Sequence, residues 1–285
     1  MFVSSLNIYP LKSARGIALG EADLHAAGLV GDRQLMLVAP DGQFVTQREL
    51  PELARLQVQH DGDGFRLWLD ENSSVSVSAD DFSQRKPVSV WRSIVDAAVA
   101  ADAANAALSD WFGRPLQLVL FDAQARRMSN PDWAGPDAPV RFADGYPVLI
   151  TTTASLEALN ADMQARGEGT VTMDRFRANI VIDGALPWQE DRWAAIRIGG
   201  LRFDLVKPCS RCIMTSQDQA SGARSVPSPL PAMGRLRMSG DRRVPGPLFG
   251  WNAVPRDEGR LKLGNTVEVL EERPEGIALK MRRDR

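Results

Sequence analysis

The chain has 285 residues, of which 44% are hydrophobic and 25% are charged, and its formal net charge is −2. This length allows one large domain or two ordinary ones, and the near-neutral charge excludes a general attraction to nucleic acid. No apolar run reaches about eighteen residues, so no segment is predicted to span a membrane. Only two cysteines are present and the start has no secretory signal pattern, so we expect a cytoplasmic protein without a disulfide framework.

The first ninety residues predict β structure. Residues 6–13 (LNIYPLKS) predict a strand that ends at a turn, and residues 33–39 (RQLMLVA) predict an apolar strand that ends at the turn PDGQ. Residues 56–69 (LQVQHDGDGFRLWL) predict a hairpin around Asp-Gly, and residues 74–81 (SVSVSADD) alternate with a period of two. Short strands between Gly/Asp turns are typical of a barrel or a sandwich.

Two conspicuous helices are expected. Residues 94–112 are rich in alanine and are followed by Gly113 and Pro115, which end helices. After a strand at 116–121 and a polar loop at 122–147, the segment PVLITTTASLEALNADMQARG predicts a strand that runs into a helix. Thr153 is its expected N-cap, and Gly167 is expected just past its last turn.

The last hundred residues predict β structure again. FRANIVIDG (176–184) and AAIRIGGLRFDLVKPC (194–209) predict three strands, the last two joined by a turn at Gly199–Gly200. Residues 219–247 are dense in Pro, Gly, Ser and Arg and predict a long loop that borders the functional entrance. We interpret its arginines as a solvated face, with attraction of an anionic substrate or an acidic redox partner as the alternative. LKLGNTVEVLEE (261–272) and GIALKMR (276–282) predict closing strands.

The sequence lacks the motifs of several common catalytic, metal and phosphate-binding sites. The only histidines are His25 and His60, there is no H-E-x-x-H, and one C-x-x-C without a second pair or a nearby histidine cannot close a structural zinc site. There is also no G-x-S-x-G for a serine hydrolase and no glycine-rich phosphate loop. The cysteines are therefore the strongest candidates for chemistry.

Both cysteines lie in KPCSRCIMTSQD, residues 207–218. A thioredoxin motif opens a helix, whereas this segment follows a predicted strand and precedes β-branched and polar residues, which disfavours a redox dithiol. Lys207 and Arg211 flank Cys209, and Arg211 directly precedes Cys212. Nearby positive charge favours the thiolate, which acts as a nucleophile or as a ligand to a soft metal. The pattern indicates one reactive thiolate, with two small buried hydrophobic cysteines as the alternative.

Six motifs, in order along nearly the whole chain, resemble those of MOSC proteins (molybdenum cofactor sulfurase C-terminal) with an N-terminal β-barrel domain, in particular the mitochondrial amidoxime-reducing component and its bacterial relatives. The motifs are IYPLKSARG (8–16), GLVGDRQLMLV (28–38), LITTTASLEALN (149–160), FRANIVIDG (176–184), CSRCIMTSQD (209–218) and PLFGWN (247–252). The resemblance implies a mainly β fold with some α (α+β class). A MOSC N-terminal β-barrel domain would occupy residues 1–120, and a MOSC β-barrel domain would occupy residues 121–285.

The resemblance further implies a molybdenum–molybdopterin cofactor, whose Mo is bound by the enedithiolate of the pterin and by one protein cysteine. The cysteine directly before the I-x-T segment matches the family's ligand, so Cys212 and not Cys209 is the expected Mo ligand and catalytic residue. Mo prefers soft sulfur donors, and a thiol must lose its proton to bind a metal, which agrees with this assignment.

The same resemblance implies cofactor-binding roles for residues far from the cysteines. Lys12 and Ser13 match positions that hold the phosphate, and Arg33 and Arg177 match positions whose guanidinium forks bind phosphate or ring carbonyls. The other matching positions are Asn179, which would pair with the pterin, Thr152 and Thr153 at a predicted helix N-terminus, and Ser210, Arg211 and Asn252. Taken singly, the lysine and the two guanidinium groups could equally be surface ion-pair partners, and Asn179 could be an edge-strand or bulge residue.

The activity that the resemblance implies is reduction of N-hydroxylated substrates, such as amidoximes, hydroxylamines and N-hydroxylated bases, by a molybdenum-dependent oxidoreductase that is independent of pyridoxal phosphate. Two cysteines cannot hold an iron–sulfur cluster, so the expected electron donor is a separate redox protein of ferredoxin, flavin or cytochrome b5 type. Two alternatives remain: a sulfur carrier or sulfurtransferase that uses a persulfide on Cys212, and a non-catalytic module that binds or transfers the cofactor.

Overall fold

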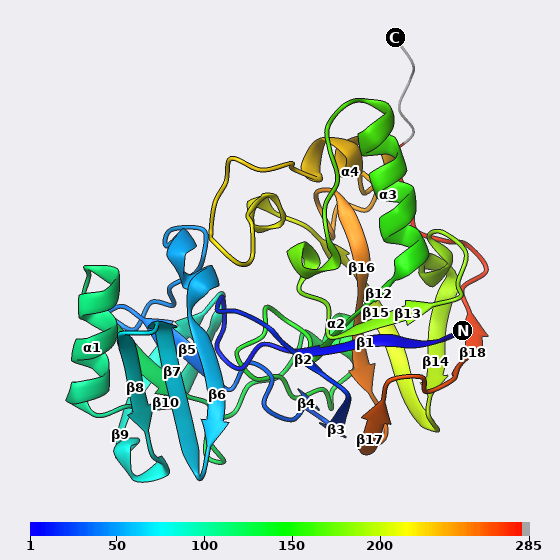
Figure 1. Ribbon diagram of the computed structural model, residues 1–285. Coiled ribbons are helices and arrows are strands. Elements are labelled where there is room, and N and C mark those ends of the chain that lie inside the picture. Colours follow the sequence, from blue (N-terminus) through cyan, green and yellow to red (C-terminus); the bar gives the residue numbers. More distant parts are fainter. Residues whose placement is uncertain (281–285) are drawn as a thin grey trace.

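Strands make up most of the regular structure, and they are divided between two bodies that lie side by side (Figure 1). The computed structural model describes residues 1–280. The expected class, mainly β with some α, is confirmed. Within these residues no helix has the length and apolar character that crossing a bilayer requires. The expected cytoplasmic location stays a prediction.

The larger body is built on an eight-stranded sheet with the order β18-β14-β15-β16-β12-β13-β1-β2. Its strands are β1 (Phe2–Ile8), β2 (Ile17–Leu19), β12 (Val148–Thr152), β13 (Ile180–Asp183), β14 (Trp193–Ile198), β15 (Leu201–Ser210), β16 (Leu248–Pro255) and β18 (Val267–Glu272). Every pair is antiparallel except β12 with β13. A small sheet of β17 (Gly259–Lys262), β3 (Glu21–His25) and β4 (Gly28–Leu29) adds buried leucines to the same core. Helices α3 (Thr153–Ala165) and α4 (Leu230–Leu236) pack together above one end of this sheet.

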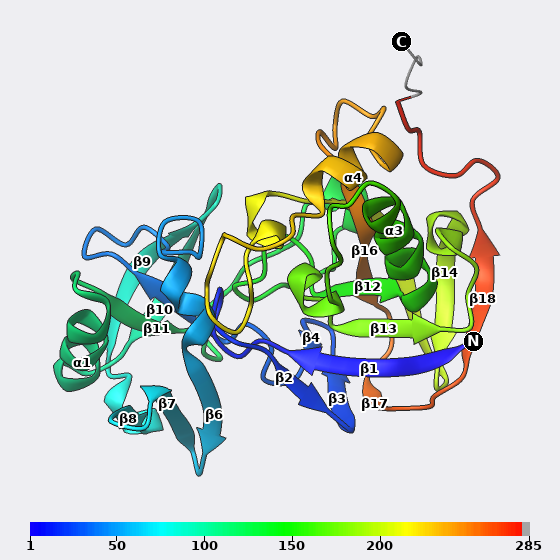
Figure 2. The ribbon, with the colours of Figure 1, turned by 45° about the horizontal axis from the view of Figure 1, so that its top comes forward.

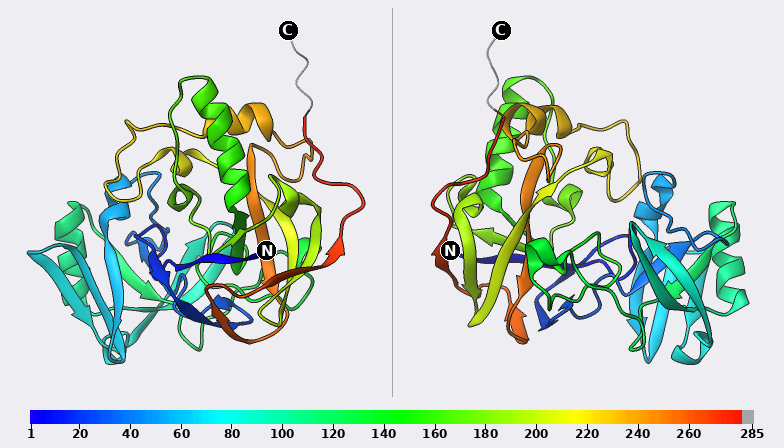
Figure 3. Two further views of the ribbon diagram at one scale, coloured as in Figure 1. Left: turned by 45° about the vertical axis from the view of Figure 1, so that its right-hand side comes forward. Right: turned by 180° about the vertical axis from the view of Figure 1, so that it is seen from behind.

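The smaller body holds two sheets and helix α1 (Asp102–Phe112). One sheet has the order β5-β11-β10-β9, and the other has the order β6-β7-β8. Their strands are β5 (Leu35–Val38), β6 (Gln57–Asp61), β7 (Gly64–Asp70), β8 (Ser73–Val77), β9 (Gln84–Val90), β10 (Ser93–Val99) and β11 (Gln117–Leu120). Buried side chains of both sheets and of α1 form one core. The two bodies thus have separate cores. The right-hand view of Figure 3 shows the two bodies from behind.

Strand β1 opens the chain but lies in the sheet of the larger body, between β2 and β13 (Figure 2). Leu6 of β1 pairs with Ile180 of β13, and both side chains are fully buried. The loop after β1 then reaches the smaller body, where Leu11 bridges to Leu35 of β5. Pairing of strands therefore ties the first residues to both bodies, and the division at residue 120 stays a prediction.

The expected helix at 94–112 is wrong over its first half. Ser93–Val99 forms β10 and pairs along its whole length with β9, and the helix α1 begins only at Asp102. Ile94 and Asp96 are exposed whereas Val95 and Ala97 are buried, an alternation with a period of two that suits a sheet. The alanine-rich composition favours a helix locally, but pairing with β9 on one side and β11 on the other decides the outcome.

Smaller corrections concern caps and loops. The N-cap of α3 is Thr152, whose hydroxyl accepts a hydrogen bond from the backbone N–H of Ser155 at 3.2 Å, and not the following threonine. Gly167 follows this helix with a φ of 69°, as expected. The loops expected at 122–147 and 219–247 hold the short helices α2 (Pro131–Ala134) and α4. Of the strand expected at 276–282, residues 276–280 form only an isolated bridge through Leu279, and residues 281–282 lie outside the described residues.

A buried carboxyl group joins α3 to the 3-10 helix Gln189–Arg192. Glu190 is 1% exposed, and its Oε2 accepts hydrogen bonds from the hydroxyls of Ser155 at 2.8 Å and Thr152 at 3.1 Å. Its Oε1 has no partner within residues 1–280. Burial, with a contribution from the neighbouring Asp191, raises the pKa of Glu190 to about 7.

This shift predicts that stability falls as the pH rises. The folded protein keeps the proton of Glu190 up to about pH 7, whereas the unfolded chain releases it near its ordinary value of about 4.3, so the free energy of unfolding declines across this window. Glu190→Gln should remove the decline and exceed the wild type at pH 8 by up to roughly 3 kcal/mol. Urea unfolding at pH 5 and pH 8 measures this, with the exposed Glu71→Gln as the control. An unchanged pH dependence in Glu190→Gln would contradict the assignment.

Candidate functional site

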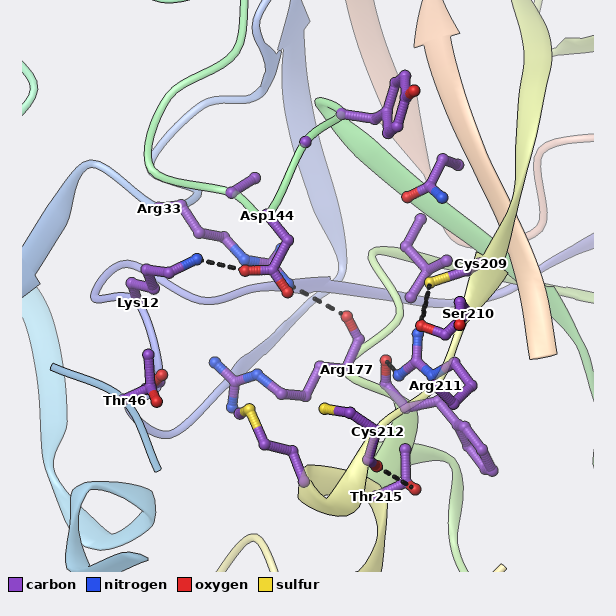
Figure 4. A pocket seen from close by; sticks show the side chains of 18 of the residues that line it. Lys12, Arg33, Thr46, Asp144, Arg177, Cys209, Ser210, Arg211, Cys212 and Thr215 are labelled. Carbon is purple, nitrogen blue, oxygen red and sulfur yellow. Dashed lines mark hydrogen bonds and ion pairs between the residues drawn. The ribbon is translucent and has the colours of Figure 1, made fainter. Parts of the chain in front are cut away.

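A cavity of about 370 Å³ opens at the junction of the two bodies. Loops of the smaller body contribute Thr46, Arg48 and Trp91, and strand ends of the larger body form the opposite wall. Of the residues predicted from the sequence, the cavity brings together Lys12, Ser13, Arg33, Arg177, Asn179, Ser210, Arg211, Cys212 and Asn252 (Figure 4). These residues span most of the chain, so the fold, and not their spacing, assembles them.

Positive charge dominates the lining of the cavity. Its cationic side chains are Lys12, Arg33, Arg48, Arg175, Arg177 and Arg211. The only carboxylate among the lining residues is that of Asp144. Because field lines concentrate in a partly enclosed space of one charge sign, the cavity attracts anions.

Lys12 and Asp144 form an ion pair at one end of the cavity (Figure 4). The Lys12 ammonium lies 2.5 Å from a carboxylate oxygen of Asp144 and 2.9 Å from the carbonyl oxygen of Phe142. Burial lowers the pKa of Lys12. Burial alone would raise the pKa of Asp144, but the charge and hydrogen bond of Lys12 hold it well below its usual range. A phosphate bound at this lysine would therefore have the Asp144 carboxylate as a neighbour.

The guanidinium groups of Arg33 and Arg177 both lie over one buried aromatic ring. Each guanidinium carbon lies 4.2 Å from the ring centre of Tyr9, a distance at which cation–π attraction operates. Arg33 also binds both carboxylate oxygens of Asp32 at 2.7 Å, whereas Arg177 donates to the carbonyl oxygen of Ala14 at 2.7 Å. Burial, with the nearby charge of Arg33, lowers the pKa of Arg177 to about 10, so it remains charged at neutral pH.

Unusual backbone conformations gather around the cavity. Non-glycine residues with positive φ are Ser13 (68°), Arg33 (47°), Trp91 (56°), Arg177 (53°) and Trp188 (61°), and all but the last line the cavity. Each such residue costs on the order of 1–3 kcal/mol and persists only where the surrounding structure enforces it. Strain of this kind concentrates at functional sites, and here it places two of the cationic side chains.

Three arginines of the lining carry buried N–H groups that lack an acceptor within the described chain. They are Arg175 Nε, Arg177 Nη2 and Arg211 Nε. A buried donor without a partner is costly, so these groups are matched to a ligand rich in acceptors. Phosphate oxygens and the ring nitrogens and carbonyls of a pterin are such acceptors. The donor set therefore fits the cofactor that the sequence motifs imply.

The two cysteines differ in their surroundings. The thiol of Cys212 points away from Thr215 (Figure 4), and Nη2 of Arg48 lies 3.4 Å from its Sγ. Its carbonyl oxygen accepts hydrogen bonds from the backbone and the hydroxyl of Thr215, which fixes the start of the 3-10 helix Ile213–Ser216. Cys209 also lines the cavity, but its Sγ is held 2.9 Å from Nη1 of Arg211. Both thiols are free.

Other predicted residues already bond within the protein. Asn179 is 2% exposed: its Oδ1 accepts from the N–H of Leu149 at 3.1 Å and its Nδ2 donates to the carbonyl oxygen of Asn7 at 3.1 Å. Asn252 donates to the carbonyl oxygen of Lys207, and the Ser210 hydroxyl donates to a loop carbonyl. These side chains reach the lining but chiefly hold neighbouring strands and loops in place.

Thr152 and Thr153 lie outside the cavity. The hydroxyl of Thr152 is fully buried and bonds to Glu190, and the hydroxyl of Thr153 donates to Asp183 at 2.7 Å. A helix N-terminus does follow β12, as predicted, but these hydroxyls turn toward the carboxylates beside it. Thr153 lines a separate hollow on the outer side of Arg177.

The structure adds lining residues that sequence reasoning missed. Arg48, Trp91, Asp144 and Arg175 lie in loops and short turns where hydrophobic periodicity gives no signal. Arg175 directly precedes the motif FRANIVIDG (176–184), so closeness to that motif is the one available signal. No residue of the 219–247 loop lines the cavity among the described residues. Several of its arginines form internal ion pairs instead, including Arg235 with Asp162.

Two family matches cover most of the chain. The MOSC N-terminal beta barrel domain matches residues 1–115, and the MOSC domain matches residues 137–268. The chain belongs to the MOSC family. This agrees with the resemblance found in the motifs, and the cavity lies where residues of both matched segments meet.

Relatives of this MOSC protein extend over nearly its whole length. Mitochondrial amidoxime-reducing component 1 of Homo sapiens is 29% identical over 94% of this chain and 82% of its own, and mitochondrial amidoxime reducing component 2 of Bos taurus is 29% identical over 93% and 82%. A molybdenum cofactor sulfurase of Oryza sativa subsp. japonica is 26% identical over 94% of this chain but only 34% of its own length. The YUAD protein from Bacillus subtilis aligns over 93% of both chains with 12% identity and a TM-score of 0.40. The curated relatives support a function related to the molybdenum cofactor.

The charge of the cavity predicts that the cofactor-free MOSC protein binds phosphate-type anions. Inorganic pyrophosphate should raise the thermal midpoint of unfolding above that in sodium chloride of equal ionic strength, because a ligand of the folded state stabilises it. Arg177→Gln should at least halve this increase, since it removes a buried cation with an unpartnered donor. Arg211→Gln tests the same loss of pyrophosphate stabilisation at a less buried arginine of the lining. Arg166→Gln, at the exposed residue that follows the end of α3, is the control, and equal increases in all variants would contradict the assignment.

Proposed function

We propose that this MOSC protein is a molybdenum-cofactor-dependent reductase of N-hydroxylated compounds such as amidoximes, hydroxylamines and N-hydroxylated bases. The observation that carries the proposal is the thiol of Cys212 in a cavity lined by cations and by N–H donors without acceptors among the described residues, while the other lining thiol, that of Cys209, is held by Arg211. Similarity over nearly the whole chain to proteins named as amidoxime-reducing components supports it.

The residues of the cavity divide into two groups by what they would bind. Cys212 would hold the metal through its thiolate sulfur, because molybdenum prefers soft donors. Arg33, Arg175 and Arg177 would bind the acceptor-rich remainder of the cofactor with planar forks of N–H groups. When bound, the molybdenum would supply the two-electron chemistry that removes oxygen from an N–OH group.

The net reaction consumes two electrons and two protons for each N–OH group and releases water. Two lining residues are poor proton donors at neutral pH: Lys12 holds the carboxyl of Asp144 ionised, and burial raises the pKa of Tyr146 to about 12. Protons would therefore reach the substrate through water from the open side of the cavity. The protein's own task is then to bind, orient and enclose.

A second candidate function is a sulfur carrier or sulfurtransferase, with a persulfide on Cys212. The similarity to a protein named as a molybdenum cofactor sulfurase favours it, although that match covers about a third of the other protein. A non-catalytic module that binds or transfers the cofactor would use the same cationic lining. The metal and pterin content separates the persulfide function from the other two, and turnover separates the reductase from the module.

Substitution of the two cysteines tests the reductase. Protein made in a cofactor-competent host should contain molybdenum and release a fluorescent oxidised pterin, and it should reduce benzamidoxime with a viologen donor. Cys212→Ser should lose molybdenum and at least a hundredfold in turnover, whereas Cys209→Ser should retain both, since Cys209 is held by Arg211. Wild-type protein without molybdenum and pterin would sink the reductase proposal. Equal turnover in Cys212→Ser and wild type would refute the ligand assignment.

The source of electrons gives a further test. The two cysteines of the chain cannot ligate an iron–sulfur cluster, so a separate redox protein would deliver electrons. The purified protein should show no turnover of benzamidoxime with NADH or NADPH alone, and turnover should appear when a reduced ferredoxin, flavoprotein or cytochrome b5 is added. Steady turnover with a nicotinamide cofactor alone would show that the chain needs no such partner.

A further inference from the structure

Arg48 and Trp91 form the part of the cavity that the smaller body presents to Cys212. Nη2 of Arg48 lies 3.4 Å from Sγ of Cys212, and its guanidinium carbon lies 4.6 Å from the ring centre of Trp91. Neither residue belongs to the set that the sequence motifs assign to the cofactor. The motifs therefore do not account for the position of these two residues beside the candidate metal ligand.

Trp91 sits in a turn that normally excludes such a residue. Val90 pairs with Ser93, so Trp91 and Arg92 alone form the turn between β9 and β10. Two-residue hairpin turns strongly favour Asn-Gly, because they require positive φ, and Trp91 has a φ of 56°. A bulky aromatic residue in this conformation breaks the local preference, and such breaks are expected where function requires a particular side chain.

The indole ring of Trp91 is nevertheless held firmly. Its Nε1 donates to Asp144 at 3.1 Å, and its ring packs 5.1 Å from that of Phe44. The side chain remains 46% exposed. A fixed aromatic ring at the open side of a cavity offers a flat surface to a planar molecule that enters from solvent.

Hydrogen bonds hold the backbone around Arg48 in place, whereas its side chain has few partners among the described residues. Nη2 of Arg224 donates to the carbonyl oxygens of Gln47 and Arg48 at 2.9 and 2.8 Å, and Nε2 of Gln47 donates to the carbonyl oxygen of Ser13 at 2.7 Å. Within residues 1–280 the thiol of Cys212 is the one recorded acceptor of the Arg48 side chain, and no carboxylate pairs with it. Most of its five N–H donors are thus free for a bound molecule.

Exposure separates this pair from the two most buried arginines proposed to hold the cofactor, although Arg33 is half-buried like Arg48. Arg175 and Arg177 are 6% and 9% exposed, whereas Arg48 is half-buried and Trp91 is 46% exposed. A retained cofactor belongs in the buried part, and a substrate that exchanges with solvent belongs in the open part. We propose that Arg48 and Trp91 form a substrate subsite that selects planar N-hydroxylated molecules carrying an anionic group. The ring of the substrate stacks on Trp91, and its carboxylate accepts hydrogen bonds from Arg48.

This inference rests on the proposed reductase function, and a pair of matched substrates tests it. The wild type should have a value of kcat/KM for 4-carboxybenzamidoxime about tenfold above that for benzamidoxime, because a charge-assisted contact contributes that much. Arg48→Gln should bring the ratio close to one. Trp91→Leu should raise KM for both substrates and preserve the ratio. Arg92→Gln, the other residue of the turn and not part of the lining, is the control with unchanged rates.

Calorimetric titration with 4-carboxybenzamidoxime, in the absence of any electron donor, measures the subsite independently of turnover. Binding should be about tenfold weaker in Arg48→Gln than in the wild type, and this difference decides the inference even if the protein proves to contain no molybdenum. Unchanged affinity and an unchanged substrate ratio would overturn the subsite. Loss of molybdenum and pterin from Arg48→Gln would also overturn it, because Arg48 would then hold the cofactor. Absence of molybdenum from the wild type would instead overturn the reductase.

Discussion

Two guanidinium groups that both lie over the buried Tyr9 ring are the contact on which the cavity depends. The attraction of each cation to the ring brings Arg33 and Arg177 into one small space, where their charges repel. Asp32 compensates Arg33, whereas Arg177 has no carboxylate in contact with it among the described residues. The larger body therefore carries a buried positive charge that only a bound anion would neutralise. Selection for binding explains such a charge better than selection for stability.

The backbone around this contact is also strained, and this strain raises the free energy of the protein as the charge repulsion does. Positive φ at Ser13, Arg33 and Arg177 directs three segments inward, and the cores of the two bodies must hold these conformations in place. Three features raise the free energy of the ligand-free protein: the backbone strain, the repulsion between charges of the same sign, and the donors without partners. A bound cofactor would remove two of these three costs, since it supplies both negative charge and acceptors. The site is thus built for the occupied state.

Sequence patterns located the part of the site that lies in short ordered segments. Arg33 and Arg177 lie in motifs that carry the family resemblance, GLVGDRQLMLV and FRANIVIDG, and Cys212 lies in the one cysteine segment of the chain. The sequence does not indicate Arg48 and Trp91, because only tertiary contacts, such as the hydrogen bonds from Arg224, place them beside the thiol.

Two further differences from expectation have related causes. Thr152 lies outside the cavity although it precedes a helix, because a helix N-terminus does not determine which way a capping hydroxyl turns, and the buried Glu190 accepts its hydrogen bond. The strand β10 was mistaken for helix because alanine favours a helix in isolation, whereas pairing with β9 decides it here. In each case the missing information was the identity of a neighbour distant in sequence.

The position of β1 explains the place of Asn179 in the cavity lining, although the oxygen and nitrogen of its side chain already bond within the protein. The side chain of Asn179 bonds to Asn7 of β1 and to Leu149 of β12, so it fastens the first strand to the centre of the sheet. Lys12 follows β1 closely, and its backbone N–H donates to Leu35 of the smaller body. Asn179 therefore fixes one end of the segment whose other end reaches across the junction. This placement sets the distance between the Lys12 end of the cavity and Arg177, two positions before Asn179 in the chain.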